Sequence, residues 1–128
     1  MTRHKTHGSA VVLALMIMLS ACADSLTEAG ESGTRWNPDE TATETRSGVT
    51  LILSYDSSSQ RFNGTATNTT NSPVSDVRVE IHLSNGTELG PTPRTSLNAQ
   101  ESKPVTLDAR GQNFDWYSVH VEFGSSSG

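Results

Sequence analysis

The sequence predicts an all-β fold: an antiparallel sandwich of six to seven strands that follows a signal peptide and a flexible linker. Three observations predict it. Apolar and polar residues alternate with a period of two in several segments after residue 47. Turn-forming residues separate these segments, and no helical periodicity is present there. The chain has a single cysteine, so no internal disulfide is available and a hydrophobic core must hold the domain.

The N-terminal residues 1–21 have the order of a secretory signal. Arg3 and Lys5 precede an apolar run from Ala10 to Leu19, and small residues follow the run. The run is about half as long as the roughly twenty residues that a helix needs to cross a membrane. A permanent transmembrane helix is therefore not expected.

Cys22 stands directly after Leu19, Ser20 and Ala21. These four residues resemble the lipobox of bacterial lipoproteins. The resemblance implies a diacylglyceryl group on the Cys22 thiol, cleavage before Cys22 and acylation of the new N-terminus. Two or three acyl chains give firm anchoring, whereas one gives reversible binding. The alternative is a plain cleavage site with an incidental cysteine.

The expected location follows from this anchor. We expect an exported protein that the lipid on Cys22 holds on a membrane. Ala23 is not the aspartate that retains many enteric lipoproteins in the inner membrane, so we expect the outer membrane or the cell surface in a Gram-negative organism.

Loss of residues 1–21 leaves seven basic and fourteen acidic residues, a formal net charge of −7. Such a surface repels phosphate backbones, so no nucleic-acid partner is expected.

Residues 22–46 are expected to form the lipid anchor, a tether and a short helix. The stretch 23–34 is polar, acidic and supplied with glycine and serine, as is typical of a flexible tether. Asn37 and Glu40 then have capping-box spacing around Pro38. These signals predict one or two helical turns that begin at Pro38 and end by about Arg46, because the threonines between them have weak helix propensity.

The β-sandwich domain is expected over residues 47–123, and its first two strands form a hairpin. Strand 49–56 is predicted to face the core with Val49, Leu51, Leu53 and Tyr55. After a polar turn, strand 61–67 is predicted to face the core with Phe62, Gly64 and Ala66. The polar tract 68–73 is the next turn.

The clearest alternation lies in residues 76–84. Its apolar members, expected to face the core, are Val77, Val79, Ile81 and Leu83. Its polar members, expected to face water, are Asp76, Arg78, Glu80, His82 and Ser84. Asn85-Gly86 predicts a hairpin with a type I′ turn, which returns through residues 87–89.

Shorter elements complete the sandwich. Gly90 to Pro93 breaks the returning strand, a short piece follows at 95–97, and a strand runs through Val105 and Leu107 after the turn 98–101. The last strand begins at Trp116 or Tyr117 and ends at Phe123. Its expected inward residues are Tyr117, Val119, Val121 and Phe123, and its expected outward residues are Ser118, His120 and Glu122. Residues 124–128 are expected to be a flexible tail.

This number of short strands is typical of an immunoglobulin-like sandwich, although the Cys…Trp…Cys pattern is absent. A partly open barrel is the alternative architecture. The chain resembles the FxLYD-type β-sandwich domain over about residues 60–123. The segments that carry the resemblance are Arg61–Asn68, Val74–Leu89 and the later Leu97…Leu107. The aromatic-acid pair that names that family is absent, and His82–Gly86 stands near its place. The resemblance implies a domain of exported or membrane-attached proteins and supplies no catalytic residue.

The candidate partner contacts are Trp36, Trp116 and Tyr117, because aromatic residues are enriched in binding hot spots. Trp36 is also interpreted as a latch that holds the linker down. One of Trp116 and Tyr117 must point outward if the last strand begins there.

His82 and His120 lie on predicted outward faces, and a zinc site with Glu80 or Glu122 beside them is the alternative to a solvated face. The solvated face is favoured because no motif fixes a third ligand, so no metal and no cofactor is assigned. No serine elbow serves either histidine, and an enzyme is not expected.

The expected function is therefore that of a membrane-anchored accessory lipoprotein. It would present a β-sandwich for interaction with an envelope protein or for envelope structure. The alternative is a small-ligand or metal-binding module of the cell envelope, based on His82 and His120.

Overall fold

The computed structural model describes residues 33–124, which form eight β-strands and no helix. The strands are β1 (Thr41–Arg46), β2 (Val49–Asp56), β3 (Arg61–Asn68), β4 (Val74–Leu83), β5 (Glu88–Leu89), β6 (Thr95–Leu97), β7 (Ser102–Asp108) and β8 (Tyr117–Phe123). The predicted signal, Cys22 and most of the tether lie outside the described residues, as does the tail after Gly124.

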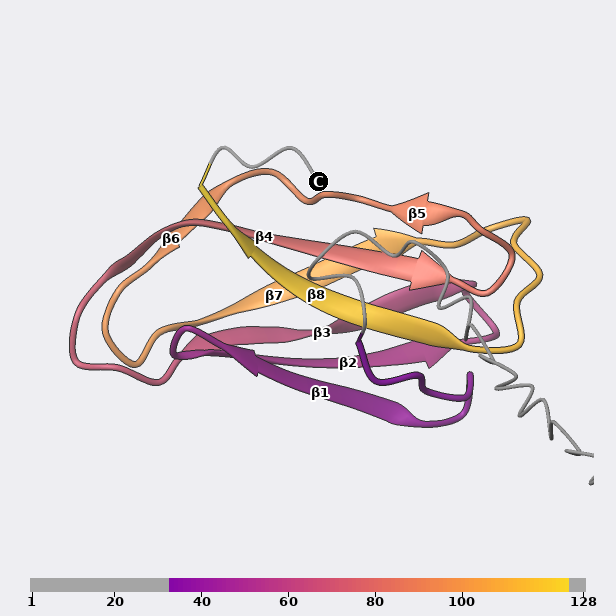
Figure 1. Ribbon diagram of the computed structural model, residues 1–128, viewed down its shortest axis with the longest axis horizontal. Helices are drawn as coiled ribbons and strands as arrows, with labels where there is room; N and C mark the ends of the chain where they lie inside the picture. The colour runs from indigo at the N-terminus through magenta and orange to yellow at the C-terminus, as the bar shows by residue number, and fades with distance from the viewer. Residues whose placement is uncertain (1–32, 125–128) are drawn as a thin grey trace, which may run out of the picture.

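The strands form two antiparallel sheets that pack face to face (Figure 1). The first sheet has the order β1-β2-β3-β7. In the second sheet β4 is central: β8 pairs with one side of it, and β5 and β6 pair with opposite ends of its other side. The predicted all-β antiparallel sandwich is confirmed, with eight strands instead of six or seven.

Inward residues of both sheets form one core, as the period of two predicts. In β2 and β3 the fully buried core residues are Val49, Leu51, Leu53 and Phe62. In β4 and β8 the buried core residues are Val77, Val79, Ile81, Leu83, Tyr117, Val119 and Val121. Tyr55 and Phe123, also predicted to face inward, are half-buried at the margin of the core.

The predicted helix is wrong: residues 41–46 are strand β1, paired with β2 from Thr41↔Ser54 to Arg46↔Val49. One of the two capping-box contacts forms: the Glu40 carboxylate accepts a 2.6 Å hydrogen bond from the Asn37 N–H, while the Glu40 N–H donates to the Asn37 backbone carbonyl at 3.0 Å. They close a turn only, because the β-branched threonines that follow gain more from pairing with β2 than from a helix. The domain therefore begins before the predicted boundary at residue 47.

Strand β8 lies between β4 and β1 in Figure 1, and β1 side chains cover its free edge. The Glu44 carboxylate accepts a 3.0 Å hydrogen bond from the Val121 N–H. The Arg46 guanidinium donates to the Val121 carbonyl at 2.9 Å and pairs with Glu122 at 3.2 Å. Both backbone groups of Val121 that point away from β4 are thus satisfied by side chains of the other sheet.

The predicted hairpin after β4 is confirmed, but its turn type is different. Leu83 pairs with Thr87 through a 2.9 Å backbone bond, so the loop has three residues, Ser84 to Gly86. Gly86 has φ +86°, whereas Asn85 has no positive φ. A type I′ turn needs positive φ at both central residues, so this loop is a type I turn followed by a left-handed glycine.

The outward face of β4 and β8 is drier than the alternation predicts. Glu80 is 5% exposed and His120 is 3% exposed, and Arg78 and Ser118 are also buried. One cause lies within the described chain: Gly33 lies against the His120 ring, where an added Cβ would stand 3.0 Å from Cε1. A strand pattern reports side-chain alternation and cannot report what packs over the polar face.

Asn68, at the end of β3, is a fully buried polar residue. Its amide nitrogen donates to the carbonyls of Ser72, Leu97 and Asn98 at 2.7, 3.2 and 3.1 Å. Its amide oxygen accepts bonds from the N–H and the hydroxyl of Thr70. One side chain thus joins the β3–β4 loop to β6.

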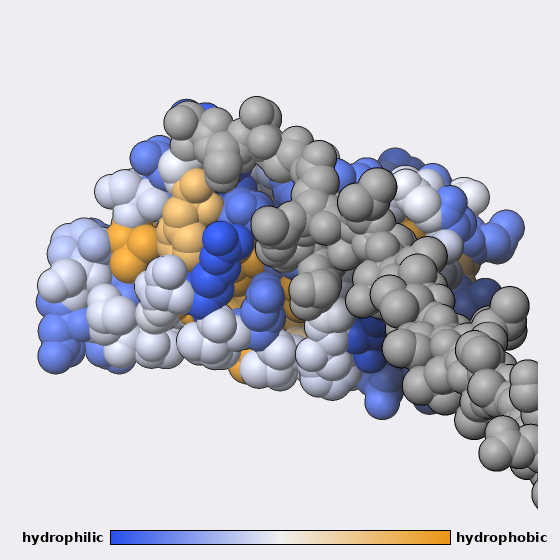
Figure 2. Space-filling view, in the orientation of Figure 1, coloured by the Kyte–Doolittle hydropathy of each residue, from blue (hydrophilic) through white to orange (hydrophobic). Residues whose placement is uncertain are grey.

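Hydrophilic residues cover most of the coloured face in Figure 2, with hydrophobic atoms showing between them. Across residues 33–124 there is no helix with the length and apolarity that a membrane crossing requires.

Candidate functional site

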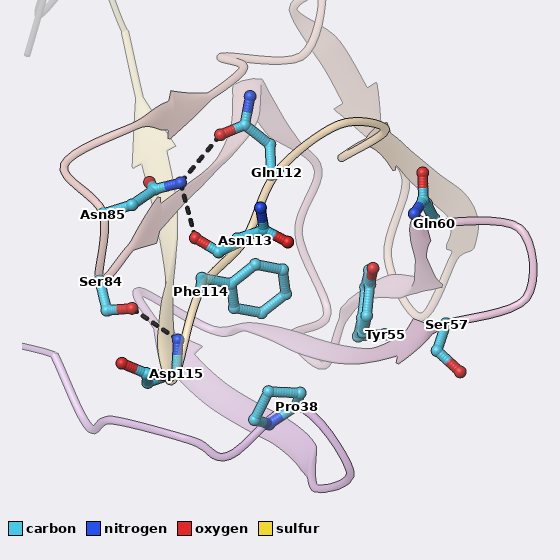
Figure 3. Close-up of a pocket in the computed structure, with 10 residues that line it drawn as sticks. All are labelled: Pro38, Tyr55, Ser57, Gln60, Ser84, Asn85, Gln112, Asn113, Phe114 and Asp115. Carbon is cyan, nitrogen blue, oxygen red and sulfur yellow. Dashed lines mark hydrogen bonds between the residues drawn. The ribbon is translucent and has the colours of Figure 1, made fainter.

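An open pocket of about 620 Å³ lies at one end of the sandwich (Figure 3). Because the strands are antiparallel, the β2–β3 turn, the β4–β5 turn and the β7–β8 loop meet at this end. Pro38, in the segment before β1, closes the lower side in Figure 3. The pocket is therefore made from four separate parts of the chain.

The floor of the pocket is aromatic. The rings of Tyr55 and Phe114 meet edge to face with their centroids 5.0 Å apart. Behind them Phe62 contacts Tyr55 at 5.0 Å and Tyr117 at 4.8 Å, and both of these rear residues are fully buried. The floor is thus the exposed margin of an aromatic cluster that continues into the core, which fixes the two rings in place.

Hydrogen bonds between two loops form one wall. Asn85 Nδ2 donates to the Gln112 side-chain oxygen at 3.0 Å and to the Asn113 carbonyl at 2.9 Å. The Ser84 hydroxyl accepts a 2.7 Å bond from the Asp115 N–H. These bonds, drawn in Figure 3, hold the β7–β8 loop against the β4–β5 turn.

Several polar groups on the rim have unused hydrogen-bonding capacity. Within residues 33–124, no partner is found for Nε2 of Gln60, Nε2 of Gln112, the side-chain amide of Asn113 or the hydroxyl of Tyr55. A side-chain amide both donates and accepts, as a peptide group does. The pocket therefore combines fixed apolar rings with amide groups available to a ligand.

The pocket has little charge. Asp115 is the one carboxylate among its ten lining residues, which include no histidine, cysteine, lysine or arginine. Acid–base or nucleophilic chemistry needs a pair of such groups within hydrogen-bond reach. This arrangement suits the binding of a neutral polar ligand.

The three predicted partner contacts have different environments in the structure. Tyr117 is fully buried and is a core residue, so it is not a surface contact. Trp36 is half-buried, packs on the core and exchanges two backbone hydrogen bonds with Tyr117 at 2.8 and 2.9 Å, as a latch would. Trp116 points outward and is half-buried, with the Arg35 guanidinium 4.1 Å from its ring centre.

The two histidines of the alternative site lie on the paired strands β4 and β8. Their rings meet edge to face with centroids 4.7 Å apart. His82 faces Glu80 and Glu88, each 3.8 Å from its Nε2, whereas His120 Nε2 bonds to the Ser118 hydroxyl at 3.1 Å. The zinc site considered from the sequence included Glu80 or Glu122 and did not include Glu88. Cys22, the predicted lipid-attachment residue, is outside the described part of the chain.

The pocket itself was not predicted from the sequence. Asn85 was interpreted as part of a hairpin turn, and Gln60 and Phe114 were given no role. A signal was present, because Gln60, Asn85, Gln112 and Asn113 all lie in turns that an antiparallel meander brings to one end. Recognising it requires the strand order, which the alternation does not supply.

Comparisons with known proteins do not show a family for this chain. No family model and no curated protein matches it. Among solved structures it is similar to a DUF1425 family member from Shewanella sp. pv-4, with 15% sequence identity and a TM-score of 0.32. The similarity covers 68% of this chain and 76% of that one. At this level the likeness carries no argument about function.

Proposed function

We propose that the chain is a membrane-anchored accessory lipoprotein that binds a peptide segment of another envelope protein in the amide-lined pocket. The observation that carries the proposal is the set of amide groups around the Tyr55 and Phe114 rings with hydrogen-bonding capacity to spare: Nε2 of Gln60 and Gln112 and the side-chain amide of Asn113. Amides match the donors and acceptors of a peptide backbone, and the rings supply an apolar surface for one of its side chains. The action is binding without turnover.

The anchor is the second part of the proposal, and the sequence supports it. The apolar run that ends at Leu19-Ser20-Ala21-Cys22 resembles a lipoprotein signal, and the resemblance to FxLYD-type domains fits an exported, membrane-attached protein. Lipid on Cys22 and a polar tether would leave the pocket free to meet a partner. Ala23 after the cysteine favours the outer membrane in a Gram-negative organism.

Site-specific photo-crosslinking in native membranes tests the proposal. A photoreactive amino acid replaces Asn113 in the pocket or, as a matched control, Asn71, an exposed amide at the opposite end of the sandwich. We expect one specific envelope protein to be captured from position 113 and not from position 71. Equal capture at both positions, or none at position 113, contradicts a binding role of the pocket.

The anchor is tested separately with Cys22→Ser. The variant is expected to leave the membrane fraction, and mass spectrometry of the wild-type protein is expected to find acyl groups on the N-terminal cysteine. A Cys22→Ser chain that stays equally membrane-bound contradicts the lipid anchor without touching the pocket.

A further inference from the structure

A cluster of metal-ligand side chains lies on the outer face of the second sheet, away from the pocket. Strand register explains it. Glu80 and His82 are two residues apart on β4 and so share a face, and His82 stands directly opposite Glu88 on β5. One potential ligand atom from each of the three residues lies within 4.8 Å of the others.

The distances leave room for an ion between the three side chains. His82 Nε2 is 3.8 Å from Oε2 of Glu80 and 3.8 Å from Oε2 of Glu88. Both distances are too long for hydrogen bonds. Zinc–nitrogen and zinc–oxygen bonds of roughly 2.0–2.2 Å place neighbouring tetrahedral ligands about 3.4 Å apart. To bind an ion, the two His82–carboxylate distances would have to shorten by a few tenths of an ångström each. The separation of the Glu80 and Glu88 oxygens, which is at most 4.8 Å, would have to shorten by more if it is near that limit.

The surroundings of the Glu80 carboxylate favour a bound cation. Its side chain is 7% exposed and is directed at His82, yet its carboxylate accepts no hydrogen bond from any residue between 33 and 124. Buried carboxylates are normally paired, hydrogen-bonded or bound to a metal ion. Glu88, half-exposed across the cluster, brings a second negative charge to the same place.

Burial and the nearby carboxylates both disfavour the charged form of Glu80. Burial raises the pKa of Glu80 above its ordinary value of 4.5, and the charges of Glu88 and Glu122 raise it further, while His82 and Arg78 lower it. A dication between the carboxylates would remove this repulsion. The imidazole of His120, packed edge to face on His82 at 4.7 Å, holds the His82 ring in position.

We propose that Glu80, His82 and Glu88 form a three-ligand site for a divalent transition metal of the zinc class. One imidazole nitrogen and two carboxylates are a donor set that zinc accepts, and magnesium and calcium do not favour the imidazole. The exposed side of Glu88 and His82 leaves the remaining coordination positions to solvent or to a group from a partner. The site joins β4 to the two-residue strand β5, so an ion there would fix the hairpin that also carries Asn85.

Zinc titration of the full chain, purified in detergent and stripped with a chelator, tests the site. We expect one zinc ion bound per chain at this site and a higher melting temperature with zinc. Glu88→Gln is the informative variant, because this side chain is half-exposed and its replacement is expected to leave the fold intact, which circular dichroism checks. It is expected to weaken zinc binding by about tenfold or more.

Asp76→Asn is the matched control. It removes the same charge from an exposed position of β4 outside the cluster, and zinc affinity is expected to stay at the wild-type value. His82→Ala must act in the same direction as Glu88→Gln. No zinc binding by the wild-type chain, or binding that Glu88→Gln and His82→Ala leave unchanged, overturns the proposal.

Discussion

The hydroxyl of Tyr117 donates a 2.6 Å hydrogen bond to the backbone carbonyl of Glu40, which joins the start of β8 to the residue before β1. The same tyrosine exchanges two backbone bonds with Trp36 and packs its ring on Phe62. A single residue therefore holds the N-terminal segment, the aromatic cluster and the last strand together at the end of the sandwich that carries the pocket.

Tyr117→Phe is expected to lower the free energy of unfolding by about 1–2 kcal/mol, because it leaves the half-buried Glu40 carbonyl without its donor. Urea denaturation of the lipid-free Cys22→Ser chain measures the change. Tyr55→Phe is the matched control, since the Tyr55 hydroxyl has no partner in the described region, and it is expected to change stability by less than about 0.5 kcal/mol. Equal effects of the two substitutions would contradict a role for the Tyr117–Glu40 bond.

Gly64 is expected to be intolerant of any side chain. It lies opposite Leu53 in the β2–β3 pair, and an added Cβ would fall on the backbone carbonyl of Ile52. Gly64→Ala should therefore destabilise the domain by more than about 2 kcal/mol, since the strands must separate to admit the methyl group. Thermal unfolding compares it with Thr65→Ala at the exposed neighbouring position, which should change little. A near-neutral Gly64→Ala would mean that the β2–β3 spacing is looser than described.

Asn68→Ala is expected to cost about 2–4 kcal/mol, because the buried Leu97 carbonyl loses its Asn68 donor and the carbonyls of Ser72 and Asn98 each lose one of two donors. Asn71→Ala, in the exposed part of the same loop, removes one long 3.5 Å contact from Gln100 and should be nearly neutral. Denaturant midpoints of the two variants measure the difference. Similar midpoints would show that solvent replaces the Asn68 amide.

The acidic residues of the outer face predict a pH dependence of stability. Burial raises the pKa of Glu80, with Glu88 and Glu122 adding to it and His82 and Arg78 opposing it; His120 also faces it from β8. An acid with a raised pKa in the folded state has no effect on stability while both states are protonated, below its ordinary 4.5. Its contribution becomes unfavourable as the pH rises from there through the folded pKa.

In chelator, Glu80→Gln is therefore expected to be more stable than the wild type at pH 7 and to show a flatter stability profile above pH 4.5. Urea denaturation at several pH values measures this. Glu44 contributes in the same sense, because burial raises its pKa against the lowering effects of the Val121 N–H and Arg46. A Glu80→Gln profile parallel to the wild type would assign the pH dependence to Glu44 instead.

The alternation of apolar residues predicted most of the strands, and burial explains why. Val49, Leu53, Val79 and Val121 each face a core that tolerates no polar group, so the period of two is enforced in the sequence. β1 was missed because Ala42 is its one buried residue, so the strand shows no apolar alternation. It also follows a capping signal that is satisfied in a turn as well as in a helix.

The candidate sites were less accessible to sequence reasoning, because both depend on strand order. His82 and His120 were placed on outward strand faces, but their adjacency depends on the β4–β8 pairing and Glu88 joins His82 only through the β4–β5 register. The pocket depends on which turns share an end of the sandwich and on the β7–β8 loop, which places Phe114 against Tyr55. Alternation reports which side of a strand is inside and carries no information about which strand lies beside it.

The side chains of Glu44 and Arg46 on the edge of β8 have a consequence for crowding. A free strand edge can template another strand, and if the proposed lipid anchor holds copies on one membrane they would meet edge to edge at high local concentration. Here the outward N–H and carbonyl of Val121 are already occupied, by one negative and one positive group from β1. A second copy would have to displace both charges before it could extend the sheet, so the domain can be densely displayed without this edge nucleating polymerisation.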